Sequence, residues 1–164
     1  MSFHKLLKDK IVSKEEALER VKALRYSSPK KIVFTNGCFD LLHPGHVDYL
    51  SQARDLGDLL ILGLNTDNSV RRLNKAPNRP VNNEQTRATV LAGLGCIDLI
   101  VLFDEETPYE LIKFLQPNVL VKGNDYKAEN IVGYDIVKAN KGEVITIQML
   151  EGYSTTKLIE KILK

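Results

Sequence analysis

The apolar run at residues 59–64, Leu-Leu-Ile-Leu-Gly-Leu, constrains the fold of this chain more than any other segment. It has no polar face, so both of its sides must be covered by other parts of the protein. A continuous run of this kind is typical of a central strand in a parallel sheet, where helices pack on both faces. The run therefore predicts a strand at the centre of an α/β domain.

Shorter apolar runs alternate with helical patterns along the rest of the chain. Ser13 and Glu16 form an S-x-x-E capping box, which predicts an N-terminal helix over about 13–25, before the core. The alternation predicts a doubly wound, parallel five-stranded sheet with ligands beyond the carboxyl ends of its strands. The expected strands are 32–34, 59–64, 100–102, 119–121 and 144–147, and the later helices are about 44–57, 68–73, 84–94, 107–116, 135–140 and 154–163.

The bulk composition excludes several classes of protein. A length of 164 residues fits one domain, over 1–164, with a real core. The net charge of +2 and the low aromatic content do not predict extended binding to nucleic acid. We expect no signal peptide, no membrane span and a cytoplasmic location. Cys38 and Cys96 are then expected to be reduced thiols.

Residues 35–46, Thr-Asn-Gly-Cys-Phe-Asp-Leu-Leu-His-Pro-Gly-His, follow the first expected strand and begin a helix. A helix that starts after a glycine-containing loop exposes backbone N–H groups and the positive end of its dipole, which favour phosphate. His43 and His46 lie on one helix face, so both can contact the same group. Pro44 is tolerated in the first turn, and Gly45 lets a ligand approach the backbone. The segment predicts a phosphate site.

Two other interpretations of the histidine pair remain open at this point. Zinc needs three or four ligands, and the remaining candidates are His4 and the isolated Cys38 and Cys96. We therefore expect no metal bound by protein side chains. The histidines could also be ordinary helix-terminal or core residues, although the strand, the glycine loop and Pro44 around them disfavour this.

Polar residues also follow later strands, at 65–67, 122–126 and 152–156. The last of these runs begins a helix, so Ser154 and Thr155 can form a second phosphate site or a plain N-cap. Asp125 fits either a ligand contact or a turn. Arg87 falls early in its helix, where a positive charge opposes the dipole and a phosphate partner would explain it. Lys75 lies in a polar loop and can equally be solvated surface.

Several common nucleotide and hydrolase motifs are missing from the sequence. It contains no Gly-Lys-Ser/Thr of a P-loop and no G-x-G-x-x-G of a dinucleotide fold. It also lacks the G-x-S-x-G of serine hydrolases. The P-loop, dinucleotide-binding and serine-hydrolase interpretations are therefore disfavoured.

The histidine segment resembles the H-x-G-H motif of the nucleotidyltransferase superfamily, and residues 152–157, Gly-Tyr-Ser-Thr-Thr-Lys, resemble its C-terminal Ser/Thr motif. Over residues 31–163 the chain is most similar to D-glycero-β-D-manno-heptose 1-phosphate adenylyltransferases, the adenylyltransferase domains of ADP-heptose synthases. Segments 35–40, 65–67, 79–82 and 121–126 carry the rest of the likeness. The resemblance implies a Rossmann-like nucleotidyltransferase fold.

The resemblance also implies residue roles. His43, His46, Lys75 and Arg87 would be catalytic, and Lys75 and Arg87 match basic positions that contact phosphates in glycerol-phosphate cytidylyltransferases. Asp40 and Lys122 would face the sugar phosphate. The implied nucleotide-binding residues are Thr35, Asn36, Gly37, Phe39, His43, His46, Gly123, Asp125, Tyr153, Ser154 and Thr155.

The implied reaction is adenylyl transfer from ATP to heptose 1-phosphate, giving an ADP-sugar for lipopolysaccharide or another heptose-containing glycan. Mg²⁺ would be the cofactor, bound through the ATP phosphates. Many members of that family carry a sugar kinase domain, so a separate upstream kinase is expected. We also expect a homo-oligomer, for example a dimer, with small-molecule substrates.

Two alternatives remain. One is a cytidylyltransferase acting on glycerol 3-phosphate or a related alcohol phosphate. Those enzymes have an arginine shortly before the Ser/Thr motif, where this chain has Met149-Leu150-Glu151, so the likeness is weaker there. The other alternative is a nucleotide-binding regulatory module without turnover.

Overall fold

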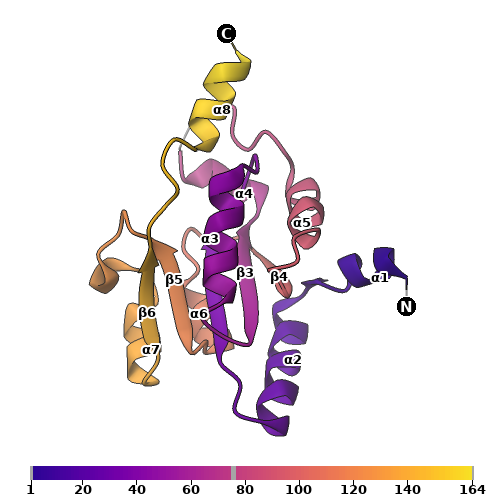
Figure 1. Ribbon diagram of the computed structural model, residues 1–164, viewed down its shortest axis with the longest axis vertical. Helices are drawn as coiled ribbons and strands as arrows, with labels where there is room; N and C mark the ends of the chain where they lie inside the picture. The colour runs from indigo at the N-terminus through magenta and orange to yellow at the C-terminus, as the bar shows by residue number, and fades with distance from the viewer. Residues whose placement is uncertain (1, 75–76, 164) are drawn as a thin grey trace.

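The computed structural model describes residues 2–74 and 77–163, which form a single parallel sheet between two layers of helices (Figure 1). The doubly wound α/β fold predicted from the alternating pattern is confirmed. The predicted strand number is wrong, because the sheet has six strands in the order β1-β4-β3-β2-β5-β6. The strands are β1 Ile11–Val12, β2 Ile32–Gly37, β3 Leu59–Asn65, β4 Leu99–Phe103, β5 Val119–Gly123 and β6 Glu143–Ile147.

The additional strand, β1, pairs with the edge of β4 through Ile11↔Ile100 and Val12↔Val101. Two residues are too few to show the period of two by which a strand is recognised in a sequence. The chain therefore gains an edge strand directly before the predicted N-terminal helix, α2 (Lys14–Ser27). The capping box of α2 forms in part, because the Ser13 hydroxyl accepts a hydrogen bond from the Glu16 N–H at 3.1 Å.

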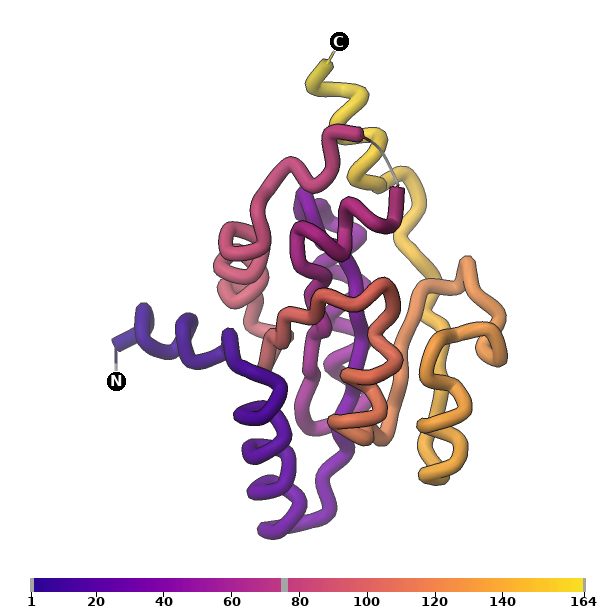
Figure 2. Tube along the Cα trace, turned by 180° about the vertical axis from the view of Figure 1, so that it is seen from behind, coloured from indigo at the N-terminus to yellow at the C-terminus, as the bar shows by residue number. Residues whose placement is uncertain are grey.

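Each face of the sheet carries its own core. On β3, Leu60, Leu62 and Leu64 pack toward α3 (Pro44–Arg54) and α5 (Glu84–Ala92), in front of the sheet in Figure 1. Ile61 points the other way and belongs to the core beneath the remaining covering helices. Figure 2 shows this second face from behind. Its helices are α2, α6 (Tyr109–Leu115) and α7 (Tyr134–Ala139).

The remaining helices lie at the ends of the domain. They are α1 Phe3–Lys8, α4 Asp67–Arg72, the short 3-10 helix η1 Ala128–Asn130 and α8 Thr155–Ile162. α8 projects from the end of the domain where α3 begins (Figure 1), and none of its residues is buried. Within the described residues, no helix combines the length and the apolar composition needed to cross a membrane.

The order in which the chain adds strands reverses between β2 and β5: β3 and β4 extend the sheet on one side of β2, and β5 and β6 extend it on the other. The β2–β3 ladder continues from Ile32↔Leu59 to Gly37↔Leu64, whereas the β2–β5 ladder pairs only Val33↔Val119 and Phe34↔Leu120. Beyond these pairs, side chains make the bridging contacts between the two strands. Thr35 Oγ1 donates to the carbonyl of Val121 at 3.0 Å, and Lys122 Nζ donates to the carbonyl of Asn36 at 3.1 Å. This reversal of strand order, at the carboxyl ends of the strands, is where doubly wound folds bind ligands.

Candidate functional site

A cavity of about 530 Å³ lies over this switch point, between the loops after β2 and β5 and the start of α8. It brings together most of the predicted nucleotide-binding residues from segments far apart in the sequence. Predicted residues that line it are Asn36, Gly37, Phe39, His46, Lys122, Gly123, Asp125, Tyr153 and Thr155. The cavity is also lined by residues that were not among the predicted site residues: Cys38, Tyr49 and Met149, and, from segments that the sequence had singled out, Arg79, Asn124, Tyr126 and Thr156.

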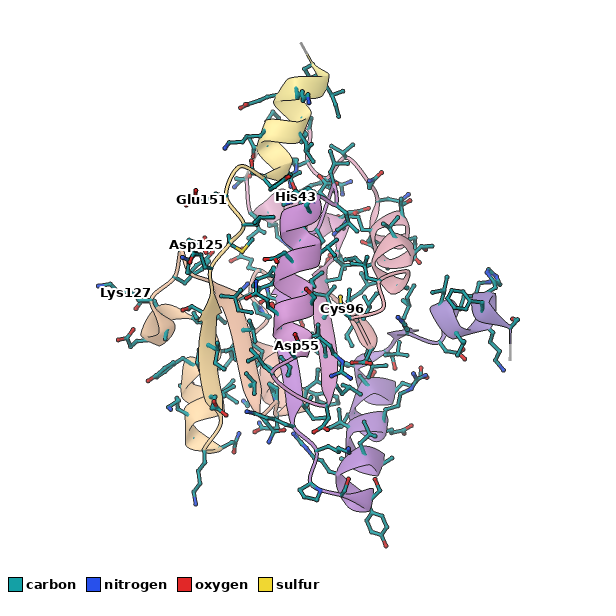
Figure 3. All side chains as sticks on the ribbon, viewed as in Figure 1. His43, Asp55, Cys96, Asp125, Lys127 and Glu151 are labelled. Atoms are coloured by element: carbon teal, nitrogen blue, oxygen red, sulfur yellow. The ribbon has the colours of Figure 1, made fainter. Side chains whose placement is uncertain are left out.

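Three rings join the two motifs at one wall of the site. The imidazoles of His43 and His46 stack with centroids 3.7 Å apart, and the Tyr153 ring lies 6.2 Å from His43 at 18°. The helices α3 and α8 therefore begin close together. Figure 3 shows His43 at the end of α3 nearest α8, with Asp55 at the opposite end. Both helix N-termini can then act on one anion.

Gly45 permits this close arrangement. A Cβ atom at position 45 would lie 3.1 Å from Nδ1 of His43 and 3.3 Å from the Cβ of Tyr153. Phe39 supports the stack from the other side, with its ring edge-on to His46 at 5.1 Å. Phe39 has a left-handed backbone with φ of 43°, which is uncommon for a bulky residue and typical of functional loops.

Both motif histidines have lowered pKa values. Burial, with smaller contributions from the positive charges of His43 and Arg79, lowers the pKa of His46 to about 4. Burial also lowers the pKa of His43. The rings are therefore neutral at neutral pH, and each can donate one N–H. Both Nδ1 atoms are buried, and among the described residues neither has a hydrogen-bond partner in the protein, so their hydrogen-bonding capacity is unfilled.

Thr35 lies under the cavity rather than in its wall. The Thr35 hydroxyl donates its one hydrogen to the Val121 carbonyl. In its 2.8 Å hydrogen bond with Tyr49, Thr35 Oγ1 is therefore the acceptor and the Tyr49 hydroxyl is the donor. Burial raises the pKa of Tyr49, which therefore remains a phenol. The pair fixes the floor of the cavity, and Tyr49 contributes to its lining.

Asp40, predicted to face the sugar phosphate, is 3% exposed and holds the loop that carries Arg79. Its carboxylate accepts from Arg79 Nε at 2.7 Å and from the N–H groups of Val81 and Asn82, each at 2.9 Å. Arg79 lines the cavity beside His46. The signal for Arg79 in the sequence was its place in segment 79–82, one of the segments that carry the family likeness.

Arg87 is 2% exposed and lies behind the site. Its guanidinium donates to the Asn82 carbonyl at 3.0 Å, the Cys38 carbonyl at 2.7 Å and Asp67 Oδ1 at 2.8 Å. Two of these partners, Asn82 and Cys38, lie in loops, and the third, Asp67, is the first residue of α4. These hydrogen bonds tie Arg87 to three segments of the chain, and its predicted catalytic contact with phosphate stays a prediction.

Two more of the predicted residues, Ser154 and Thr155, lie at the start of α8. The Ser154 hydroxyl caps the helix by accepting from the Lys157 N–H at 3.1 Å, while Thr155 and Thr156 line the cavity. Lys75 lies outside the described residues. Asp125, from the loop after β5, lies at the same end of the sheet as His43 (Figure 3).

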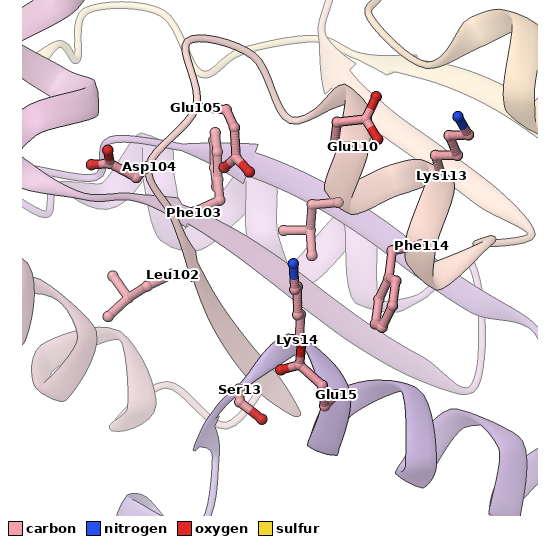
Figure 4. A pocket seen from close by; sticks show the side chains of 11 residues that line it. Ser13, Lys14, Glu15, Leu102, Phe103, Asp104, Glu105, Glu110, Lys113 and Phe114 are labelled. Atoms are coloured by element: carbon pink, nitrogen blue, oxygen red, sulfur yellow. The ribbon is translucent and has the colours of Figure 1, made fainter.

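A larger cavity, of about 630 Å³, lies away from the switch point, between the starts of α2 and α6 and the end of β4 (Figure 4). Lys14 and Lys113 share it with Glu15 and Glu110, so its charge is mixed. Neither motif histidine lines it. We place the candidate active site in the cavity beside His46, where the helix N-termini and the histidine rings converge.

Comparisons with known proteins identify the family of the chain. A family model described as cytidylyltransferase-like matches residues 34–161, a range that includes both motifs. The bifunctional protein HldE of Syntrophotalea carbinolica is 53% identical over 163 residues, which are 99% of this chain and 33% of that protein. HldE of Citrifermentans bemidjiense is 54% identical over 94% of this chain and 32% of its own length. The chain thus spans about a third of the length of these curated relatives.

Solved structures share the fold. A lipopolysaccharide core biosynthesis protein from Thermoplasma volcanium is 26% identical with a TM-score of 0.65, covering 74% of this chain and 99% of that one. Pantoate-β-alanine ligase from Francisella tularensis is 18% identical with a TM-score of 0.54, covering 93% of this chain and 77% of that one. The second likeness concerns the fold alone.

Proposed function

The chain belongs to the cytidylyltransferase-like family, and from this premise we propose that it transfers an adenylyl group from ATP to heptose 1-phosphate. An oxygen of the sugar phosphate attacks the α-phosphorus of ATP. The bond from the α-phosphorus to the oxygen that bridges to the β-phosphorus breaks, and pyrophosphate leaves. The product is an ADP-sugar, a precursor for lipopolysaccharide or another heptose-containing glycan.

The observation that carries this proposal is the meeting of the two motifs. The ring stack of His46, His43 and Tyr153 joins the start of α3 to the start of α8 beside one cavity. Two helix N-termini and two N–H donors at one place suit a polyphosphate, which carries several negative oxygens. A regulatory module could bind nucleotide there too, so turnover is the decisive property.

In this mechanism no protein side chain becomes covalently attached. Transfer of a phosphoryl-type group depends on holding the reactants in line and on stabilising negative charge that builds on the oxygens. The neutral imidazoles of His43 and His46 donate N–H bonds to those oxygens. Arg79 and Lys122 bring positive charge to the same cavity. Asp40 orients Arg79 through the 2.7 Å bond to Nε.

Mg²⁺ is the proposed cofactor, held by the ATP phosphates. Among the described residues, no group of three or more His, Cys, Asp or Glu side chains is arranged to hold a metal ion. This suits Mg²⁺, which keeps several waters and binds largely through substrate phosphates. When bound, Mg²⁺ neutralises charge on the phosphate oxygens.

Adenine is the proposed base, and heptose the proposed sugar. Met149 lines the cavity in the segment where the related cytidylyltransferases have an arginine. The choice of heptose as the sugar rests on segments 79–82 and 121–126, whose residues resemble those of heptose 1-phosphate adenylyltransferases. The fold likeness to a lipopolysaccharide core biosynthesis protein agrees with this choice.

We further propose that a sugar kinase activity supplies the 1-phosphate and that the protein acts in the cytoplasm as a homo-oligomer. Cys38 and Cys96 are both free thiols, as a reducing compartment would keep them.

The test offers ATP and CTP in parallel against heptose 1-phosphate and glycerol 3-phosphate, and follows pyrophosphate release. We expect turnover with ATP and heptose 1-phosphate. Turnover with CTP and glycerol 3-phosphate alone would replace the proposal with the cytidylyltransferase alternative. Nucleotide binding without pyrophosphate release in any combination would support the regulatory module.

A further inference from the structure

A second cavity, of about 210 Å³, lies on the other side of the switch point from α3 and α8. Asn36, Gly37, Cys38, Lys122 and Tyr126 line both this cavity and the one beside His46. The two hollows therefore share one wall, made by the ends of β2 and β5. His46, Tyr153 and Thr155 contribute only to the first cavity.

In-line transfer requires this kind of arrangement. The attacking oxygen and the leaving pyrophosphate lie on opposite sides of the α-phosphorus. If the helix N-termini hold the pyrophosphate, the acceptor must approach across the shared wall. Lys122, which lines both cavities, is placed where the acceptor phosphate would meet the nucleotide.

The chemistry of the second cavity suits a small polyhydroxylated molecule. At about 210 Å³ this cavity is less than half the size of the 530 Å³ cavity beside His46. Its far wall carries Glu106 and Thr107 from the loop before α6 and Asn130 from η1. Among the described residues, these three side chains form no hydrogen bond with the protein, so their polar groups can bind hydroxyls. Pro108, Ile131 and Val132 supply apolar surface for the C–H groups of a ring.

The shared wall also holds an acceptor without a partner. Asn36 Oδ1 is buried, and no described residue donates to it. A buried polar atom in this condition is costly unless a ligand or water completes its hydrogen bonds. A sugar hydroxyl is such a donor.

We propose that this second cavity binds the sugar ring of the acceptor, with Glu106, Thr107 and Asn130 selecting for its hydroxyl groups. The inference rests on the proposed function and adds to it the place and the selecting residues of the acceptor. Glu106 is an acceptor-only side chain, which favours a ligand rich in hydroxyl donors. A smaller alcohol phosphate would reach Lys122 but leave the far wall uncontacted.

The test measures initial rates for Glu106→Ala and Asn130→Ala with heptose 1-phosphate and ATP varied separately. We expect the KM for heptose 1-phosphate to rise by roughly threefold to tenfold, as the loss of one hydrogen bond predicts. The KM for ATP should stay within about twofold of the wild-type value, because the nucleotide cavity is unchanged. A variant that had lost its fold would lose ATP affinity as well.

Glu105→Ala is the matched control. Glu105 neighbours Glu106 but lines the separate cavity near α2 and α6, so its KM values should not change. Wild-type turnover combined with an unchanged acceptor KM in both test variants would overturn the inference and leave the proposed function standing. If the wild-type protein did not turn over heptose 1-phosphate, the proposed function would be overturned. The assignment of the acceptor sugar to this cavity would then fall as well, because it rests on that function.

Discussion

The imidazole rings of His43 and His46 stack with their centroids 3.7 Å apart and their planes 20° apart. At this distance, protonation of one ring disfavours protonation of the other, and burial acts in the same direction. Both rings are therefore held neutral. A polyphosphate can then draw on two N–H donors without first displacing a salt bridge.

We predict that acid destabilises the protein through His46. Its folded pKa of about 4 lies below the ordinary value of 6.5, so the unfolded state binds more protons between these values. The free energy of unfolding should fall as the pH drops from about 6.5 toward about 4. Thermal melts across this range should show that the Tm of His46→Asn depends less steeply on pH than the Tm of the wild type. His4→Asn, on exposed α1, should keep the wild-type slope, and equal slopes in all three proteins would contradict the prediction.

We predict that His46→Ala lowers kcat by about 100-fold to 1,000-fold, the range for donors that stabilise developing charge. His43→Ala should cause a similar loss. Val47→Ala is the control, because Val47 lies on the same helix and is 43% exposed. Steady-state rates with saturating substrates measure the effect. A folded His46→Ala protein with wild-type kcat would remove this residue from the mechanism.

For Arg79→Lys we expect the KM for ATP to rise about tenfold, the lower end for losing a hydrogen bond to a charged group. Lysine keeps the charge, but a single ammonium group cannot replace a guanidinium that contacts Asp40 while lining the cavity. Arg71→Lys, at an exposed position of α4, should behave as the wild type. An unchanged KM for ATP in Arg79→Lys would mean that Arg79 only holds its loop in place through Asp40 and does not contact ATP.

Arg87→Met should lower the free energy of unfolding by about 3 kcal/mol, because it leaves buried partners of a charged pair unsatisfied. Arg72→Met should cost less than about 1 kcal/mol, because the Arg72–Asp104 pair is exposed. Urea denaturation of both variants provides the comparison. If Arg87→Met kept its stability but lost kcat, Arg87 would contact phosphate directly, as its sequence position predicted.

Nucleotide binding should slow amide hydrogen exchange in α8. This helix has no buried residue, and its first residue, Thr155, is tied to the domain by a weak 3.4 Å bond to the Leu41 carbonyl. Contact of its N-terminus with the ATP phosphates would restrain it. Exchange measured with and without ATP tests this, and α7, away from the cavity, is the internal reference. Equal exchange in α8 under both conditions would exclude a phosphate contact there.

The parts of the fold that the sequence could predict are those with local patterns. β3 was predictable because its continuous apolar run is typical of a strand buried on both faces, and α3 because Pro44 and the histidine segment mark its start. β1 was missed because two residues carry no period. α1 was missed as well, although Ser2 caps it by accepting from the Lys5 N–H.

The site shows the same division. His46 and Thr155 could be placed in one cavity because each lies at a recognisable helix start. The surroundings of Arg87 could not be predicted, because one partner, Cys38, is 49 positions away and contributes only a backbone carbonyl. Arg79 was missed for a similar reason: Asp40, which holds it, is 39 positions away.

The early end of the β2–β5 ladder has a consequence for how the site can diverge. Beyond Phe34↔Leu120, the gap between the two halves of the sheet is spanned by the Thr35 hydroxyl and the Lys122 ammonium. A backbone ladder fixes strand spacing whatever the side chains are, but this gap is set by two side-chain lengths. Substitutions at Thr35 or Lys122 can therefore change the space between the nucleotide and acceptor cavities without changing the register of any strand. Relatives can in this way acquire new acceptors while keeping the same sheet.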